Sequence, residues 1–348
     1  MQYTKLGRSD LNVSRLCLGS MSWGSNSTAQ EGHYQMDRCL EAGINFIDTA
    51  EMYPTYPVKP ETVGNSEAII GDWFKASGKR ADIVIATKVS GPNGGFIRDG
   101  KGYDSAVIAQ AVEGSLQRLQ ADVIDLYQLH WPVRGSYHFR QNWDYDPSAH
   151  MGREDVVAHM LDVLGAMQKL VDAGKIRHFG LSNESTWGTA MWLRLAEENG
   201  LPRVASVQNE YSLLCRLADT DLAELCVQEE VGLLPFTPLA AGMISGKHGP
   251  DRIAPNSRRS IDATLSNRVT DRVWPAVEAY GAGAAKHGLD VNAMALAWTL
   301  RRPFVASSIF GARGEAQLET ALSAVELELS DEVMADINAV HRAHPMPF

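Results

Sequence analysis

The sequence predicts an α/β fold, a (β/α)8 barrel of the TIM type with an added N-terminal β-hairpin and an extra C-terminal helix. Short apolar runs alternate with amphipathic helical patterns, which is typical of parallel strands joined by crossover helices. The unit repeats eight times, and eight parallel strands close this type of barrel. We therefore expect a single barrel domain over residues 1–348, with an open doubly wound sheet as the alternative.

The predicted strands mostly lack strict alternation, as expected for parallel strands covered on both faces. They cover residues 16–18, 45–48, 83–87, 123–129, 179–182, 205–208, 231–236 and 305–309. Between them, apolar residues recur at helical spacing, for example over 107–119 and 157–171. Asp104 or Ser105 is placed to cap the first of these two helices, and the second ends at Gly174.

Three additions frame the predicted barrel. Residues 3–6 and 12–15 flank the turn sequence Gly7-Arg8-Ser9-Asp10, which indicates a hairpin that we expect to plug the bottom of the barrel. Residues 134–153 contain glycine, proline and several aromatic residues, and they predict a long loop after the fourth strand. Ser330 is placed to cap a terminal helix that runs through Val340 with an acidic first turn.

The composition is that of a globular protein, with 45% hydrophobic and 21% charged residues. The net charge of −10, with acids and bases mixed, argues against a nucleic-acid or anionic-membrane surface. The four cysteines show no metal-type spacing, and no segment resembles a leader or a membrane span. We expect a cytoplasmic protein with reduced thiols that acts on a small molecule, and the sequence makes no prediction of oligomeric state.

Polar residues stand where the predicted strands end. The second to sixth runs end in Asp48, Lys88, His130, Ser182-Asn183 and Gln208-Asn209. In a barrel the carboxyl ends of the strands line the active site. Strand ends are often polar for structural reasons alone. That explanation is weaker for Asp48, Lys88 and His130 together, because each of these ionisable side chains would need a partner when buried. This pattern favours an active site.

Reduction of a carbonyl group needs a hydride donor and a general acid for the developing oxyanion. Tyr53, five residues after Asp48, is a candidate for that acid. A neighbouring Lys88 ammonium would stabilise the phenolate, and Asp48 would hold the ammonium in place. His130 would orient the substrate oxygen through a hydrogen bond. The four residue types fit this one reaction.

Several segments resemble the aldo-keto reductase superfamily. They are 43–53 (GINFIDTAEMY), 85–88 (IATK), 125–132 (DLYQLHWP) and 174–183 (GKIRHFGLSN), and they occur in the family's order over essentially the whole chain. The sequence Glu51-Met52-Tyr53-Pro54 and the segment 305–308 (VASS) are most similar to the bacterial Tas-like branch. The resemblance implies an NADP(H)-dependent oxidoreductase that reduces aldehydes or ketones, with Asp48, Tyr53, Lys88 and His130 as the catalytic residues.

The resemblance also implies a cofactor site. Ser182, Asn183 and Gln208 would bind the nicotinamide carboxamide, and Phe236 would stack on the ring, although it could also be plain core. Lys247 matches the pyrophosphate loop, or it is a solvated loop lysine. The remaining positions that match the family's cofactor contacts are Gly19, Ser20, Met21, Asp48, Thr237, Pro238, Leu239, Ala240, Gly242, Gly311, Ala312, Arg313 and Gln317.

One departure from the family pattern concerns the adenosine end of the cofactor. The asparagine that the family usually supplies to adenine is replaced here by Ala321. Arg313, by contrast, is well suited to a ribose 2′-phosphate, because a guanidinium binds phosphate oxygens in a fork. NADP(H) is therefore favoured over NAD(H).

Two other functions remain open at this point. A metal-dependent barrel hydrolase or isomerase could use Asp48, Glu51, His130 and Glu210 as ligands, although Lys88 would oppose a cation there and no metal motif is present. A cofactor-binding sensor or regulatory subunit could share the same barrel. For a substrate pocket, the apolar wall candidates are Trp23, Tyr56, Trp131 and Trp143.

Overall fold

A computed structural model describes residues 1–55 and 57–348 of the chain. Its main sheet has eight parallel strands in the order β10-β3-β4-β5-β6-β7-β8-β9. Their bounds are Leu16–Gly19 (β3), Phe46–Asp48 (β4), Val84–Val89 (β5), Ile124–Leu129 (β6), Ile176–Ser182 (β7), Val204–Gln208 (β8), Gly232–Leu233 (β9) and Ser308–Phe310 (β10). All eight predicted strands are present, with shifted ends.

The sheet closes on itself at its two outer strands. Leu233 in β9 forms a parallel bridge with Val305, just before β10. The Ala306 amide donates to the Leu233 carbonyl at 2.9 Å, and the Ile309 amide donates to the Pro235 carbonyl at 2.9 Å. The predicted barrel is therefore confirmed, and the alternative of an open doubly wound sheet is wrong.

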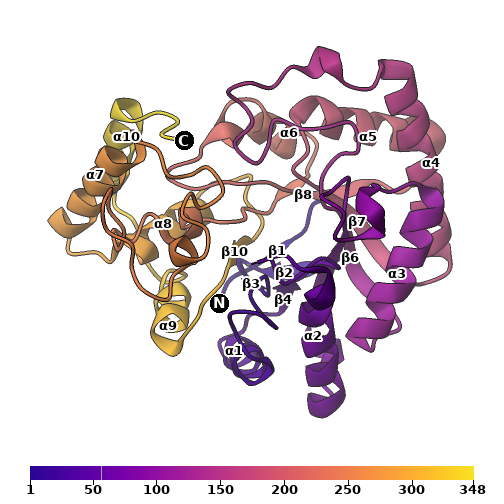
Figure 1. Cartoon of the computed structure of the whole chain (residues 1–348), viewed down its shortest axis with the longest axis horizontal. Helices are drawn as coiled ribbons and strands as arrows, with labels where there is room; N and C mark the ends of the chain where they lie inside the picture. The colour runs from indigo at the N-terminus through magenta and orange to yellow at the C-terminus, as the bar shows by residue number, and fades with distance from the viewer. Residues whose placement is uncertain (56) are drawn as a thin grey trace.

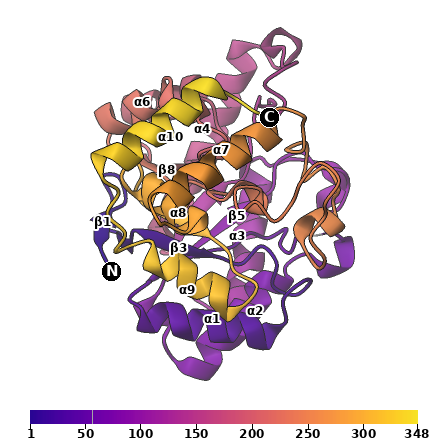
Figure 2. The same cartoon turned by 90° about the vertical axis from the view of Figure 1, so that its left-hand side faces the viewer.

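Helices form the outer layer of the barrel (Figure 1). The helices of this layer are Ala29–Glu41 (α1), Asn65–Ser77 (α2), Ser105–Leu119 (α3), Arg153–Asp172 (α4), Thr186–Asn199 (α5), Leu222–Gln228 (α6), Val291–Leu300 (α8) and Glu315–Ser323 (α9). Two further helices, Val273–Lys286 (α7) and Asp331–Ala343 (α10), lie side by side on one flank of the barrel (Figure 2). Short 3-10 helices cover Pro60–Thr62, Arg80–Asp82, Arg98–Gly100, Pro147–Ala149, Leu217–Asp219, Ala240–Gly242 and Arg258–Ser260.

The caps of two predicted helices follow from their sequences. Asp104, rather than Ser105, caps α3 by accepting a hydrogen bond from the Val107 amide at 2.9 Å. Ser330 caps α10 by accepting from the Val333 amide at 3.3 Å, which confirms the predicted terminal helix. Each cap satisfies an amide that the first turn of a helix leaves without a partner.

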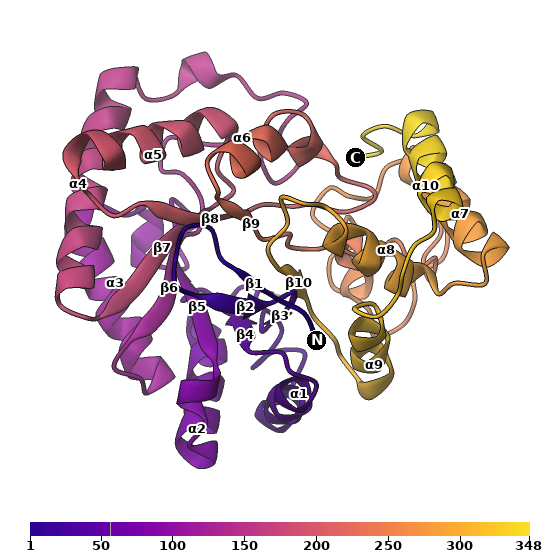
Figure 3. The same ribbon diagram turned by 180° about the vertical axis from the view of Figure 1, so that it is seen from behind.

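The N-terminal hairpin plugs one end of the barrel, as predicted. Strands Tyr3–Lys5 (β1) and Asn12–Ser14 (β2) pair antiparallel and lie across the end of the barrel strands (Figure 3). Apolar side chains of the hairpin and of the barrel interior form one buried cluster: Leu6, Leu11, Val13, Cys17, Phe46, Ala86, Leu126, Ala205, Leu234, Ala306 and Ile309. The interior is thus a packed core closed at the bottom, and the opposite end carries the carboxyl termini of the strands.

The connections at that opposite end are long. The predicted loop after β6 lies between Leu129 and Arg153, with one 3-10 turn inside it. The connection between β9 and α7 is longer still, and it contains two 3-10 turns. Across the residues that the structure describes, no helix is both long enough and apolar enough to cross a membrane.

Candidate active site

Four side chains meet at the carboxyl ends of β4, β5 and β6. Asp48 is the last residue of β4, Tyr53 lies in the loop after it, and His130 directly follows β6. Lys88 lies within β5, which continues to Val89, so the predicted strand end at Thr87 was too early. None of the four is more than 7% exposed. Neighbouring parallel strands bring these residues together although they are up to 82 positions apart in sequence.

Lys88 is the centre of this group. Its ammonium Nζ donates to Asp48 Oδ2 at 2.6 Å and to the Thr49 carbonyl at 2.7 Å, and it lies 3.4 Å from the hydroxyl of Tyr53. Complete burial disfavours the charged form of Lys88, but the Asp48 carboxylate and Tyr53 more than offset that effect and raise its pKa. Lys88 is therefore a buried ammonium that faces a phenol.

The Asp48 carboxylate is fixed by amides on its other oxygen. Gln128 Nε2 and Gln208 Nε2 donate to Asp48 Oδ1 at 3.1 and 2.8 Å. Gln208 Nε2 also lies 3.0 Å from Gln128 Oε1, so the two amides support each other. The sequence-based prediction missed Gln128. Its signal was a polar side chain within a fully buried strand, where a hydrogen-bond partner is required.

His130 faces Tyr53 across the site. The two rings meet edge to face with centroids 5.8 Å apart, and Trp131 packs 4.7 Å from the imidazole. Burial, together with the positive charge of Lys88, holds the pKa of His130 well below its usual range. His130 is therefore a neutral imidazole at pH 7. Its Nδ1 is buried without a hydrogen-bond partner among the described residues.

Asn183, which follows β7, presents an open acceptor next to this group. Its Nδ2 donates to the His130 carbonyl at 2.9 Å and to Ser182 Oγ at 3.0 Å. Its Oδ1 is buried, and no described residue hydrogen-bonds to it. A buried acceptor of this kind needs a donor, and the NH2 group of a carboxamide would fit it. The prediction that Asn183 binds the nicotinamide carboxamide is therefore consistent with the unsatisfied Oδ1 of this residue.

The first strand and the segment after β9 border the same region. Ser20 is buried and its hydroxyl donates to the Asp48 carbonyl at 3.1 Å, while Gly19 and Met21 are half-buried. Phe236 is also half-buried, and its amide donates to the Asn209 carbonyl at 3.1 Å. An aromatic ring that remains partly accessible at the carboxyl end of a strand can stack on a planar ligand.

The segment after Phe236 has an unusual backbone. Thr237, Ala240 and Ala241 have φ values of 55°, 47° and 57°, and Gly242 has a φ of 90°. The step from right-handed Leu239 to left-handed Ala240 is a backbone conformation that can turn successive amides toward one side and form an anion-binding concavity. Pro238 and Leu239 complete this segment. The side chain of Lys247 folds over Gly242, and its Nζ lies 3.2 Å from the point that a Cβ on this glycine would occupy.

Three cations gather where this segment meets the chain after β10. Partial burial and the positive charges of Arg258 and Arg313 lower the pKa of Lys247. Arg258 also approaches Gly311, with Nη2 3.8 Å from the point that a Cβ there would occupy. Like charges held together in a protein of net charge −10 indicate an anion site. Arg258 was not among the predicted residues; its signal was the Arg258-Arg259 pair in the loop that carries Lys247.

The chain after β10 is anchored around Arg313. The Arg313 amide donates to Gln317 Oε1 at 3.0 Å, and the guanidinium contacts the Asn256 carbonyl. The Ala312 carbonyl accepts from Gln35 Nε2 of α1 at 3.1 Å. Ala321 is buried in α9 and offers no polar group there.

The four residues predicted to line a substrate pocket differ in burial and position. Trp131 is half-buried beside His130, and its indole donates to the Pro92 carbonyl at 2.8 Å. Trp143 is 51% exposed on the loop after β6. Trp23 is completely buried under α1 and donates to Gln35, so its prediction as a pocket wall must be corrected. Tyr56 lies outside the described residues.

Other apolar residues surround Tyr53 instead. Met21, Val58, Phe96, Ile97 and Trp131 are partly buried and pack against the cluster that contains it. Phe96 and Ile97 were missed because nothing in a loop sequence shows where the loop folds back. These walls are apolar, which suits an uncharged organic substrate.

The acidic residues that a metal-dependent hydrolase or isomerase would use as ligands already form ion pairs with cationic side chains. Arg98 forms a bidentate pair with Glu51, and Asp48 is bound to Lys88. Glu210 is bound to two arginines. Carboxylates that already neutralise cations make a poor donor set for a metal ion. The structure therefore does not favour this alternative.

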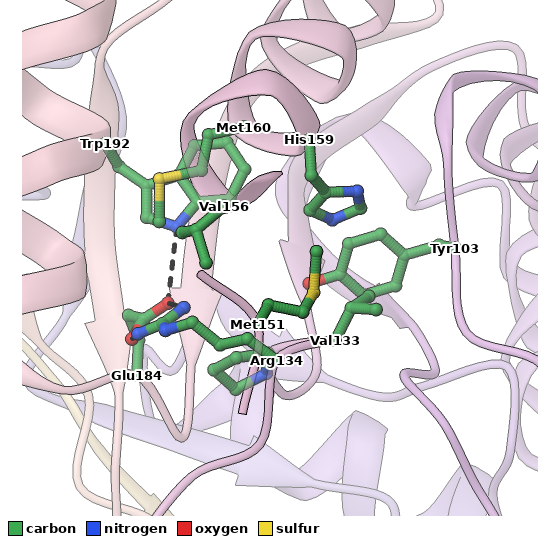
Figure 4. A pocket seen from close by; sticks show the side chains of 10 residues that line it. Tyr103, Val133, Arg134, Met151, Val156, His159, Met160, Glu184 and Trp192 are labelled. Atoms are coloured by element: carbon green, nitrogen blue, oxygen red, sulfur yellow. Dashed lines mark hydrogen bonds and ion pairs between the residues drawn. The ribbon is translucent and has the colours of Figure 1, made fainter. Parts of the chain in front are cut away.

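A narrow pocket lies beside the site, under the loop after β6 (Figure 4). Glu184 and Arg134 form one wall, and the Trp192 indole donates to Glu184 Oε2 at 3.3 Å. Tyr103, His159 and Met151 form much of the rest. None of the catalytic candidates lines this pocket, so the chemistry lies elsewhere.

Residues 15–342 match the family described as the Aldo/keto reductase family. The chain belongs to this family. Protein tas of Escherichia coli is 40% identical over 351 residues, covering 100% of this chain and 99% of that protein, and confirms the resemblance to the Tas-like branch.

Two further relatives extend the comparison. An uncharacterized oxidoreductase of Bacillus subtilis, YrpG, is 32% identical and covers 98% of this chain and 96% of its own length. A probable voltage-gated potassium channel subunit beta of rice is 28% identical and covers 99% and 98%. Membership of the family supports an oxidoreductase activity for this aldo/keto reductase.

Proposed function

We propose that this aldo/keto reductase reduces aldehydes or ketones to alcohols with NADP(H) as the hydride source. The observation that carries the proposal is the buried ammonium of Lys88, which binds Asp48 at 2.6 Å and lies 3.4 Å from the Tyr53 hydroxyl. A buried cation beside a phenol stabilises the phenolate, so the phenol can release a proton to a substrate oxygen.

Each residue of the group has one part in this reaction. Tyr53 donates the proton, Lys88 stabilises the phenolate that remains, and Asp48 holds Lys88 in place. His130 is neutral because of burial and of Lys88, and one of its ring nitrogens can donate a hydrogen bond to the substrate carbonyl oxygen. The apolar walls around Tyr53 keep water away, which strengthens these electrostatic effects.

When bound, the reduced dinucleotide supplies the hydride. Asn183, Ser182 and Gln208 would hold the carboxamide, and Phe236 would stack on the ring. The amides of Leu239 and Ala241, which donate no hydrogen bond to another described residue within the turn, would bind the pyrophosphate together with Lys247. Arg258 and Arg313 would bind a 2′-phosphate, which supports NADP(H) over NAD(H).

The direct test is oxidation of NADPH by the purified protein in the presence of a panel of carbonyl compounds. We expect turnover with uncharged aromatic or medium-length aldehydes, with NADH a weaker donor. Tight NADPH binding without turnover of any compound in the panel would contradict the proposed reaction.

That last outcome would instead favour a sensor or regulatory subunit. The relative from rice is named as a channel subunit beta, and the alignment with it covers nearly the whole of both chains. For this protein we place such a role second, because the Lys88 and Tyr53 arrangement is the one that proton transfer requires. A sensor would bind NADPH and change conformation, but it would need no proton donor.

A further inference from the structure

One carboxylate ties together two loops at the mouth of the barrel. Glu210, two residues after β8, accepts from Arg140 Nη1 at 2.6 Å through Oε2 and from Arg268 Nε at 2.7 Å through Oε1. The three side chains are between 4% and 8% exposed. We call Arg140, Glu210 and Arg268 the arginine–glutamate triad.

The two arginines come from loops with different tasks. Arg268 lies near the end of the connection between β9 and α7, which also carries Lys247 and Arg258, the cations proposed for the cofactor phosphates. Arg140 belongs to the loop after β6, which borders the substrate side of the site. Glu210 therefore joins a cofactor loop, residues 237–272, to a substrate loop, residues 131–152.

Arg140 is also close to the catalytic group through its neighbour. Phe139 precedes it, and the Phe139 ring lies 6.0 Å from Trp131, edge to face. Trp131 in turn packs 4.7 Å from the imidazole of His130. A shift of Arg140 would thus move the rings that support His130.

A second contact links the same two regions independently. The guanidinium of Arg272, just before α7, lies 4.5 Å from the ring centroid of Trp143 in the substrate loop. The backbone of Glu210 is joined to the nicotinamide side as well, because Glu210 and Phe236 form a parallel bridge. The triad therefore stands between Phe236, the cofactor loop and the substrate loop.

Burial makes this junction costly to open. When one loop opens, Glu210 keeps only one of its two cationic partners and loses a charge-assisted hydrogen bond at a buried position, which is destabilising. Each arginine also fixes the Glu210 carboxylate for the other, so opening of one loop loosens the anchor of the second. Hydrogen-bond and salt-bridge networks of this kind can carry coupling between sites.

We propose that Glu210 is a positioning residue that couples the cofactor loop to the substrate loop, so that closure of residues 237–272 on the cofactor orders Phe139 and Trp131 beside His130. The identity of the bound cofactor rests on the proposed function, but the coupling of the loops does not. The coupling has a clear signature: a change in one loop must act on the other.

The test uses Arg140→Met and Arg268→Met, each of which removes one arm of the triad from its own loop. Hydrogen exchange is measured first without cofactor. We expect Arg268→Met to raise exchange in residues 131–152 and Arg140→Met to raise it in residues 237–272. Exchange changes confined to the loop that carries the substitution would overturn the proposal.

The second measurement uses NADPH and a simple aldehyde. Arg140→Met should speed NADPH dissociation about tenfold, and Arg268→Met should raise the KM for the aldehyde about tenfold at saturating NADPH, within the ~5- to 150-fold range of such couplings. The kcat should fall far less than on removal of the Tyr53 hydroxyl, because the residues around Lys88 are intact and only the rings beside His130 are loosened. Wild-type NADPH dissociation in Arg140→Met would also overturn the proposal.

Two variants separate coupling from general destabilisation. The control Glu67→Gln disrupts a different buried ion pair. Glu67 in α2 is fully buried and binds Arg118 in α3, and neither helix belongs to the cofactor loop or the substrate loop. This substitution should lower the melting temperature and leave loop exchange and NADPH dissociation unchanged; the same loop effects in this variant would count against coupling. Glu210→Gln should show both cross-effects, and Glu210→Asp should restore part of the coupling. Failure of the wild type to bind NADPH would contradict the proposed function, while the exchange experiment still decides on the coupling.

Discussion

At the scale of single residues, the proposed function makes the Tyr53 hydroxyl the proton donor of the site. Tyr53→Phe removes only this hydroxyl and leaves the Lys88 and Asp48 pair in place. We expect kcat for aldehyde reduction to fall by about 10²- to 10⁴-fold, the usual contribution of general acid catalysis, with little change in the Kd for NADPH. Near-normal kcat in this variant would remove Tyr53 from its role and direct attention to His130.

Lys88→Met tests the partner of that hydroxyl. Without the ammonium the phenolate loses its stabilising charge, so a higher pH is needed to ionise the phenol. We expect a lower kcat and a basic limb of the pH–rate profile that moves upward. Circular dichroism checks that the variant folds, because Asp48 loses its cation. A basic limb that stays in place would show that Lys88 does not govern the ionisation of Tyr53.

Arg313 and Arg258 test the choice of cofactor. Arg313→Ala should weaken NADPH binding by about 1.5–3 kcal/mol, the range for hydrogen bonds to charged groups, and should barely affect NADH. Arg258→Ala is the matched variant from the other side of the cation cluster. Fluorescence titration with both cofactors measures these effects. Equal losses for NADPH and NADH in Arg313→Ala would show that Arg313 does not bind the 2′-phosphate.

The sequence predicts the residues that carry charge better than the residues that support them. Asp48, Lys88 and His130 stand at the ends of apolar runs, so their convergence follows from the barrel. Gln128 and Arg258 do not follow an apolar run in this way, and their weaker signals do not identify a role, because that role depends on neighbours in other segments. Trp23 was misassigned because its position after the first strand is compatible with either the mouth or the core, and only packing against α1 distinguishes them.

At the scale of elements, periodicity identifies the strands, but pairing fixes their ends. β9 is only two residues long although the apolar run covers 231–236. On one side the segment pairs with the residues before β10 through a single bridge, between Leu233 and Val305. β5 extends beyond its apolar run and includes Lys88, because strand pairing continues to Val89. Hydrogen bonds between strands far apart in sequence leave no local pattern that would predict these limits.

The hairpin that plugs the barrel gives a test at this scale. Gly7 has a φ of 58°, and a Cβ at this position would lie 2.4 Å from the Ala205 carbonyl. Gly7→Ala should cost about 1–2 kcal/mol for the left-handed backbone and about 1–3 kcal/mol more for the clash. Gly174→Ala is the control, because Gly174 has a φ of 68° and no atom within 4 Å of such a Cβ. Urea unfolding that shows equal losses would contradict close packing of the hairpin turn.

At the scale of the whole molecule, buried histidines link stability to pH. Burial lowers the pKa of His138 to about 4, and the pKa of His130 is also lowered. The unfolded chain binds these protons below about pH 6.5 while the folded protein does not, so the contribution of His138 is present above that pH and is lost as the pH falls toward 4. We expect a loss of about 1 kcal/mol from His138 at about pH 5.5.

His138→Gln checks this effect. The glutamine can keep a hydrogen bond to the Glu184 carbonyl, but it does not titrate. The variant can be less stable at pH 7, yet its free energy of unfolding should fall less between pH 7 and about pH 5.5 than that of the wild type, by the same amount of about 1 kcal/mol. An unchanged pH dependence would show that His138 takes up its proton equally in both states.

The order of the chain around the barrel has a consequence for engineering. Asp48, Tyr53, Lys88 and His130 all precede Gly174, while Asn183, Phe236, the cofactor loop and Arg313 all follow it. Gly174 lies in an exposed turn between α4 and β7, with no atom within 4 Å of the point that a Cβ would occupy. A chimera joined at this turn would therefore inherit the proposed proton-transfer group from one parent and most of the proposed dinucleotide contacts from the other. Relatives that differ in cofactor preference could exchange that trait as one continuous half of the sequence.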